Sequence, residues 1–161
     1  MTNVNVLEGK PVGSKYKIGI VVSRFNDPIG KRLLSGALKT LEAKGLAGSD
    51  IDVVWVPGAW EIPVVASKLD GTAKYQGLIA LGAIVEGKTS HHEYIANEVA
   101  TALRQLTQKT GIPVAFGVLT TASVNQALAR SSEKREGNKG SEAAEHLLET
   151  LSVIDQIRHA D

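Results

Sequence analysis

Residues 78–94 read LIALGAIVEGKTSHHEY, and this stretch decides how the chain folds. An apolar run typical of a buried strand is followed by a turn at residues 87–89 and then by a helical pattern. Ser90 and Glu93 fit the S-x-x-E capping box, which predicts that the helix begins near His91. The stretch therefore reads as a strand that leads through a short turn into a helix.

The turn between this strand and helix has the features of an anion site. A helix start beside a flexible glycine leaves backbone N–H groups free, and the positive end of the helix dipole adds to their attraction for a phosphate or carboxylate. Lys88 and Thr89 stand next to it, and His91 supplies a group that titrates near neutrality. Glu86 and Glu93 offset part of the positive field.

Composition narrows the function classes. The chain has 161 residues, 43% hydrophobic and 22% charged, which suits one domain with a real core. Eighteen basic and seventeen acidic residues leave a net charge of +1, so neither nucleic acid nor an anionic membrane is an expected partner. Cysteine is absent, which excludes disulfides and thiolate metal sites. We expect a cytoplasmic protein, since the start of the chain does not resemble a signal peptide.

The rest of the chain repeats the alternation of strand and helix. Strands are predicted at residues 16–22, 51–56 and 113–119, besides the one in the 78–94 stretch. Helices are predicted from Pro28 to Gly45, over 59–69, from His91 to about Lys109, from Ser123 and over 141–158. Residues 1–15 form an arm and 16–158 a single domain. The fold class is α/β: a parallel sheet of four strands with helices on both faces, in three layers.

Ligands of such sheets bind at the carboxyl ends of the strands. Two aromatic residues, Phe25 and Trp60, a carboxylate, Glu61, and His91 all follow strand ends, next to the predicted anion site. Together they predict a pocket for a flat heterocycle with a polyol tail beside a phosphate subsite. Arg130 and Lys139, which flank the loop before the last helix, either reach that phosphate or are solvated surface charges.

The glycine-rich segment, the two histidines and the two aromatic residues each have another possible interpretation. Residues 82–89 satisfy the P-loop pattern G-x-x-x-x-G-K-[ST], but residues 83–85 are apolar and look like strand. His91 and His92 could bind metal, yet adjacent helical residues point in different directions, so no metal is expected. Taken singly, either histidine could cap the turn, and Phe25 or Trp60 could pack as core.

Several motifs taken in order resemble the lumazine synthase family, whose members catalyse the penultimate step of riboflavin biosynthesis. The resemblance spans about residues 16–155 and rests on SRFN (23–26), PGAWEIP (57–63), GKTSHHEY (87–94), FGVLTT (116–121), Gln126-Ala127 with Arg130, and GNKG (137–140). It implies a flavodoxin-like sheet and a cofactor-free condensation of 5-amino-6-ribitylaminouracil with 3,4-dihydroxy-2-butanone 4-phosphate. The product is 6,7-dimethyl-8-ribityllumazine, with release of phosphate and water.

The resemblance also implies a role for each matching residue. Phe25 stacks on the pyrimidine, the segment of Ala59, Trp60 and Glu61 holds the ribityl chain, and backbone near Ala83 and Ile84 reads the uracil edge. The turn of Gly87, Lys88 and Thr89, together with Arg130, binds the phosphate. His91 is the proton carrier, and Phe116 comes from the adjoining subunit to close the pocket.

The chain departs from the family pattern at Glu86, where Arg is commoner, at Trp60, where Phe is commoner, and at Lys88, which is usually small or acidic. The turn before Gly137 is one residue longer than usual. The resemblance implies a homopentamer at minimum, with a sixty-subunit shell and riboflavin synthase as a partner left open. A P-loop nucleotidase and a non-catalytic flavin- or lumazine-binding relative remain as alternatives.

Overall fold

A computed structural model describes residues 2–13 and 15–160 of the chain. Its centre is a four-stranded, all-parallel sheet with the strand order β2-β1-β3-β4. The strands are β1 (Ile18–Ser23), β2 (Ile51–Val56), β3 (Gly77–Val85) and β4 (Val114–Thr121). Each strand is followed by a helix, so the chain returns to the same end of the sheet before the next strand begins.

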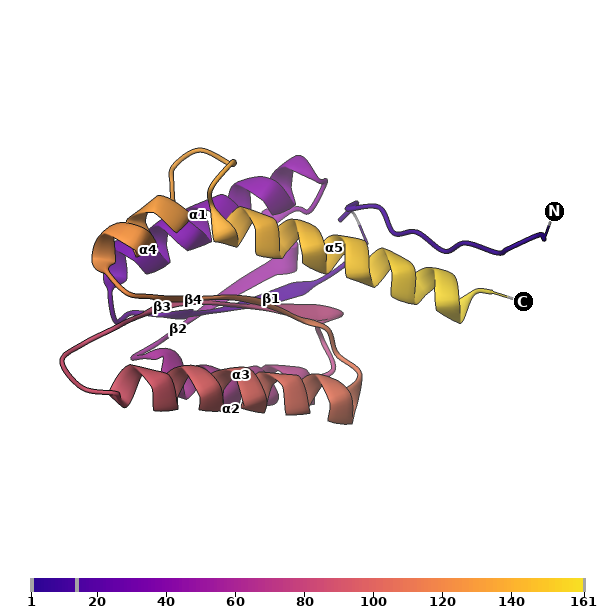
Figure 1. Ribbon diagram of the computed structural model, residues 1–161. Helices are drawn as coiled ribbons and strands as arrows, with labels where there is room; N and C mark the ends of the chain where they lie inside the picture. The colour runs from indigo at the N-terminus through magenta and orange to yellow at the C-terminus, as the bar shows by residue number, and fades with distance from the viewer. Residues whose placement is uncertain (1, 14, 161) are drawn as a thin grey trace.

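Helices cover both faces of the sheet and make three layers. Figure 1 shows α1, α4 and α5 on one face and α2 and α3 on the other. The bounds are α1 (Asp27–Ala43), α2 (Ile62–Gly71), α3 (His91–Thr110), α4 (Val124–Arg130) and α5 (Lys139–Arg158), with short 3₁₀ turns η1 (Gly48–Asp50) and η2 (Ala59–Glu61). The predicted α/β class with a flavodoxin-like parallel sheet is confirmed.

Two apolar clusters hold the layers together. One lies between the sheet and the α1/α5 layer and includes Ile20, Leu33 and Leu147. The other lies between the sheet and the α2/α3 layer and includes Ile62 and Leu78. The central strands β1 and β3 contribute to both clusters, which explains why they are apolar almost throughout.

The helix starts differ in part from the expected caps. At α3 the boundary at His91 is as predicted, but Ser90 makes no side-chain cap hydrogen bond, so the predicted capping box is wrong. At α4 the Ser123 hydroxyl accepts from the backbone N–H of Gln126, as a cap should. The last helix begins at Lys139, two residues earlier than predicted, because the Asn138 side chain caps it.

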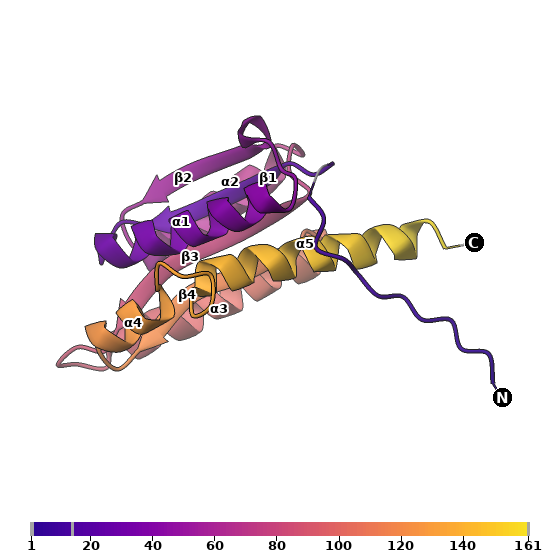
Figure 2. The same ribbon diagram turned by 90° about the horizontal axis from the view of Figure 1, so that it is seen from above.

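The N-terminal segment, residues 2–13, contains neither helix nor strand. Near its end it runs beside α5 (Figures 1 and 2), where the Lys10 N–H donates to the Ser152 hydroxyl and the Gln156 side chain donates to the Glu8 carbonyl. The division into an arm, 1–15, and a domain, 16–158, stays a prediction. Among the described residues, none of the helices combines the length and apolarity needed to cross a membrane.

Candidate active site

A cavity of about 480 Å³ lies where the carboxyl ends of β1, β2 and β3 meet the start of α3. This is the edge of the sheet at which parallel α/β folds bind ligands. The predicted site residues that line it are Phe25, Ala59, Trp60, Ala83, Ile84, Gly87, Thr89 and His91. Segments that are far apart in the sequence thus meet in one cavity, as the analysis of strand ends predicts.

Two large aromatic side chains form part of the cavity wall. Phe25 is 71% exposed and Trp60 is 57% exposed, and both line the cavity. The backbone around Phe25 is fixed, because its N–H donates to the Pro57 carbonyl at 3.0 Å. Asn26 holds the left-handed conformation and its amide donates to the Ala83 carbonyl. The aromatic wall is therefore mounted on a rigid turn.

The turn after β2 uses its own carboxylate for support. The Glu61 carboxylate accepts a hydrogen bond from the backbone N–H of Gly58 at 3.0 Å, which closes the η2 turn. This turn buries Ala59 and leaves Trp60 beside the cavity. Glu61 itself is not among the lining residues, so its predicted contact with a ribityl chain stays a prediction.

The turn before α3 brings polar backbone to the cavity. The Thr89 hydroxyl accepts from the His91 N–H at 3.4 Å, and the His92 ring contacts the Thr89 carbonyl through Nδ1 at 3.1 Å. Gly87 and Thr89 line the cavity, whereas Lys88 is exposed and outside the lining. In the first turn of α3 the Glu93 N–H donates to the Ser90 carbonyl at 3.0 Å and the His91 N–H to Thr89, so the positive end of the helix dipole is the main feature here that favours an anion.

The P-loop interpretation is wrong. Gly82 and the three residues after it belong to β3, which ends at Val85, so they cannot wrap around a phosphate. The region between β3, which ends at Val85, and α3, which begins at His91, is short.

Three predicted site residues lie elsewhere. Phe116, Arg130 and Lys139 line a separate hollow of about 360 Å³ between β4 and α5. The Lys139 ammonium is 2.7 Å from the Glu142 carboxylate and lowers the pKa of that carboxyl, chiefly by this hydrogen bond. Phe116 pairs with Ala80 in the middle of the β4 ladder rather than at a strand end, which is why it does not reach the cavity of its own chain.

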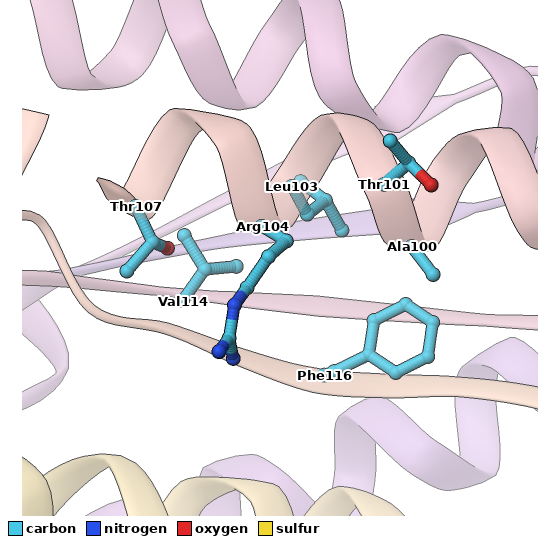
Figure 3. Close-up of a pocket in the computed structure, with 7 residues that line it drawn as sticks. All are labelled: Ala100, Thr101, Leu103, Arg104, Thr107, Val114 and Phe116. Carbon is cyan, nitrogen blue, oxygen red and sulfur yellow. The ribbon is translucent and has the colours of Figure 1, made fainter. Parts of the chain in front are cut away.

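Phe116 also borders a hollow of about 510 Å³ on the other face of β4. Figure 3 shows Arg104 extending from α3 across β4, with Phe116 beside it on the strand. β4 is an edge strand and Phe116 is half exposed, so its ring is presented to whatever lies beyond the sheet.

Sequence reasoning missed three lining residues, Val85, His92 and Ile95, and gave no role to Pro57 and Gly58, which follow the end of β2 and also line the cavity. Helical spacing could have found Ile95, which lies four residues after His91 on the same face of α3. The sequence suggests a metal ligand or a cap for His92, yet both histidines of the first turn border the cavity. Within the described residues, no group of three His, Asp or Glu side chains is arranged to hold a metal ion.

Comparison with known families gives one finding. A family model described as 6,7-dimethyl-8-ribityllumazine synthase matches residues 15–155. The match begins before β1 and ends within α5, so it includes every strand and both hollows as well as the cavity. The resemblance of the short motifs is thereby confirmed over nearly the whole length, and the chain belongs to the 6,7-dimethyl-8-ribityllumazine synthase family.

Proposed function

We propose that this chain condenses 5-amino-6-ribitylaminouracil with 3,4-dihydroxy-2-butanone 4-phosphate to form 6,7-dimethyl-8-ribityllumazine. Membership in the family indicates an enzyme of riboflavin biosynthesis with a transferase-type reaction. The observation that carries the finer proposal is the cavity at the strand ends, where aromatic walls, a histidine and the start of α3 lie together. A planar heterocycle and a phosphate are the ligand parts that such walls suit.

Each part of the cavity has a role in this proposal. Phe25 stacks on the pyrimidine, and the ribityl chain lies along the turn of Ala59, Trp60 and Glu61. Backbone at Ala83 and Ile84, where β3 reaches the cavity, reads the uracil edge. The phosphate sits against the turn that contains Gly87 and Thr89, with Lys88 adding charge from outside the cavity.

The chemistry needs orientation and a proton carrier. The primary amine of the uracil attacks the ketone, and loss of water gives an imine. Elimination of phosphate then leaves an enol, which tautomerises to a new carbonyl at the carbon that carried the hydroxyl group. Attack of the ribitylamino nitrogen on this carbonyl closes the ring with loss of a second water. No electrons enter or leave from outside. His91, at the cavity beside the phosphate turn, accepts and returns the protons in these steps.

We further propose that each active site is shared between two copies of the chain. Phe116, Arg130 and Lys139 lie on the β4–α5 side, away from the cavity that they would complete. A neighbouring copy can present them there only if its β4 edge faces the cavity, an arrangement that a closed ring satisfies at every site. In line with the resemblance, we propose that the ring is a pentamer; the riboflavin synthase partnership stays a prediction.

The activity is tested by mixing the purified protein with both substrates, without metal or nucleotide, and measuring lumazine fluorescence against the uncatalysed rate. We expect turnover that falls by about 10² in His91→Ala, the size of a typical acid–base contribution. His159→Ala, an exposed histidine at the end of α5, is the matched control and should retain full activity. Ligand binding without turnover would identify a non-catalytic binding relative instead.

Sharing of the site is tested by mixing subunits. His91→Ala and Arg130→Ala proteins, each nearly inactive, are unfolded together and refolded as mixed assemblies. Since each shared site takes His91 from one copy and Arg130 from the next, random mixing should restore up to about one quarter of the sites. Failure to restore activity, with both variants assembled normally, would contradict the sharing.

A further inference from the structure

His92 makes a contact that the proposed reaction does not use. Its Nδ1 atom lies 3.1 Å from the Thr89 carbonyl oxygen, and its ring lines the cavity next to His91. A carbonyl oxygen can only accept, so Nδ1 must carry the hydrogen. Both the neutral Nδ1–H tautomer and the imidazolium ion supply that hydrogen, and the bond therefore survives a change of protonation.

The contact is one of three hydrogen bonds at the end of the turn that the structure describes, beside the bond from the Glu93 N–H to the Ser90 carbonyl at 3.0 Å and the bond from the His91 N–H. Residues 86–90 are exposed, and the turn is anchored at its beginning by the bond from the Glu86 N–H to the Thr121 carbonyl at 2.9 Å. At its end the Ser90 side chain does not cap α3, and the bond from the His91 N–H to the Thr89 hydroxyl is long at 3.4 Å. The shorter of the two side-chain bonds at this end comes from His92.

We propose that His92 is a positioning residue for the phosphate subsite. By donating a hydrogen bond to the Thr89 carbonyl oxygen, it holds this oxygen toward its own ring. A carbonyl oxygen turned toward the cavity would repel a bound anion. His92 also fixes Gly87 and Thr89 relative to the start of α3, so that the positive end of the helix and the Thr89 hydroxyl face one bound phosphate. This inference rests on the proposed function, in which a phosphorylated ketone binds at this turn.

Three substitutions separate the hydrogen bond from packing. In His92→Asn the side-chain amide can place an N–H close to where Nδ1 lies, whereas in His92→Gln the amide extends further, toward the place of Nε2. His92→Phe keeps a ring of similar bulk and removes both nitrogens. If the Phe variant folds poorly, the Asn and Gln pair still decides the question, because both are small polar amides.

The readouts are kcat, the KM for the butanone phosphate and the inhibition constant of inorganic phosphate. We expect His92→Phe and His92→Gln to weaken both phosphate-dependent constants by about three- to tenfold, the range of one ordinary hydrogen bond, and to change kcat by less than about twofold. His92→Asn should stay within about twofold of the parent protein. The KM for the ribitylaminouracil should not change in any of the three.

Two kinds of result would overturn the inference. Phosphate constants that stay unchanged in all three variants, or that rise equally in the Asn and Phe variants, would show that the Nδ1 bond does not organise the turn. A fall in kcat with unchanged phosphate constants would place His92 in the chemistry instead. Failure of the proposed function looks different, because then the parent protein itself would form no lumazine.

Discussion

Asn138 connects three parts of the α1/α5 layer, and replacing it should be costly. Its Oδ1 accepts the Ser141 N–H at 3.0 Å and caps α5, while its Nδ2 donates to the Arg32 and Ser132 carbonyls at 3.1 and 2.8 Å. The residue is 4% exposed, so water cannot replace these bonds. Asn138→Ala loses a cap worth about 1 kcal/mol and two hydrogen bonds worth about 1 kcal/mol each, or about 3 kcal/mol in all.

The assay is urea unfolding followed by circular dichroism, at one fixed protein concentration because assembly also stabilises the folded state. A loss of this size in a chain of this length corresponds to a fall in Tm of about 6–12 °C. Asn125→Ala, at an exposed position of α4, is the matched control and should change stability by less than about 0.5 kcal/mol. A loss below about 1 kcal/mol in Asn138→Ala would refute the reasoning.

Asn138→Asp divides the two functions of the side chain. Aspartate is a good N-cap and keeps the acceptor for Ser141, but it removes both donors and places a carboxylate oxygen against two carbonyl oxygens. We therefore expect it to be at least as destabilising as alanine at neutral pH. Native stability in Asn138→Asp would show that the cap alone accounts for the contribution.

Four other substitutions test the packing and one titrating group. Gly140→Ala should destabilise the protein by about 1–3 kcal/mol, because the new Cβ would lie 2.0 Å from the Leu33 carbonyl oxygen. At Gly71 a new Cβ would meet open space, so Gly71→Ala should stabilise the protein by about 0.5–1 kcal/mol. The urea midpoints of the two variants measure both effects. Ser23→Ala should raise the midpoint, since the buried Ser23 hydroxyl has no hydrogen-bond partner within the described residues. A hydrogen bond to Asp52 and burial raise the pKa of Tyr75 to about 12. The folded state holds the Tyr75 proton more tightly than the unfolded state does, so this hydrogen bond contributes fully to stability below about pH 10. The contribution is lost between about pH 10 and 12, and Tyr75→Phe should therefore flatten that part of the plot of unfolding free energy against pH.

Much of the fold was predictable because local signals agreed with one another. β2 was predicted with its observed bounds, since a β-branched run ends at Pro57 and Gly58. The start of α3 at His91 was also predicted correctly, although the expected Ser90 cap is absent. A helix boundary depends on several weak preferences together, so its position can be right while one assumed bond is wrong.

The parts that were not predictable depend on tertiary contacts. Gly140 reads as a loop residue in sequence, yet it lies inside the first turn of α5. A glycine is needed there because the α1 backbone at Leu33 approaches too closely for a side chain. The Asn138 side chain, which caps α5, likewise donates to the Arg32 carbonyl, more than a hundred residues earlier in the chain. Neither partner can be identified from nearby sequence.

The same distinction applies to the candidate site. The residues that follow strand ends meet in one cavity because parallel strands all end at one edge, which a sequence of alternating elements already implies. Arg130 and Lys139 come after the last strand, and local sequence does not say which side of β4 they occupy. The structure places them with Phe116 in another hollow, and this separation depends on tertiary structure that the local sequence does not encode.

The polar side chains around the cavity are mostly used to hold backbone in place. Asn26 binds the Ala83 carbonyl, Glu61 binds the Gly58 N–H and His92 contacts the Thr89 carbonyl. The rest of the lining is two aromatic rings, aliphatic side chains such as Ile84 and Ile95, two glycines, Thr89 and His91. Such a site is poorly suited to a mechanism that needs a protein nucleophile. We propose that it serves a condensation in which one substrate carries the amine nucleophile and the other the leaving group, so that fixed orientation and a single proton carrier supply the rate enhancement.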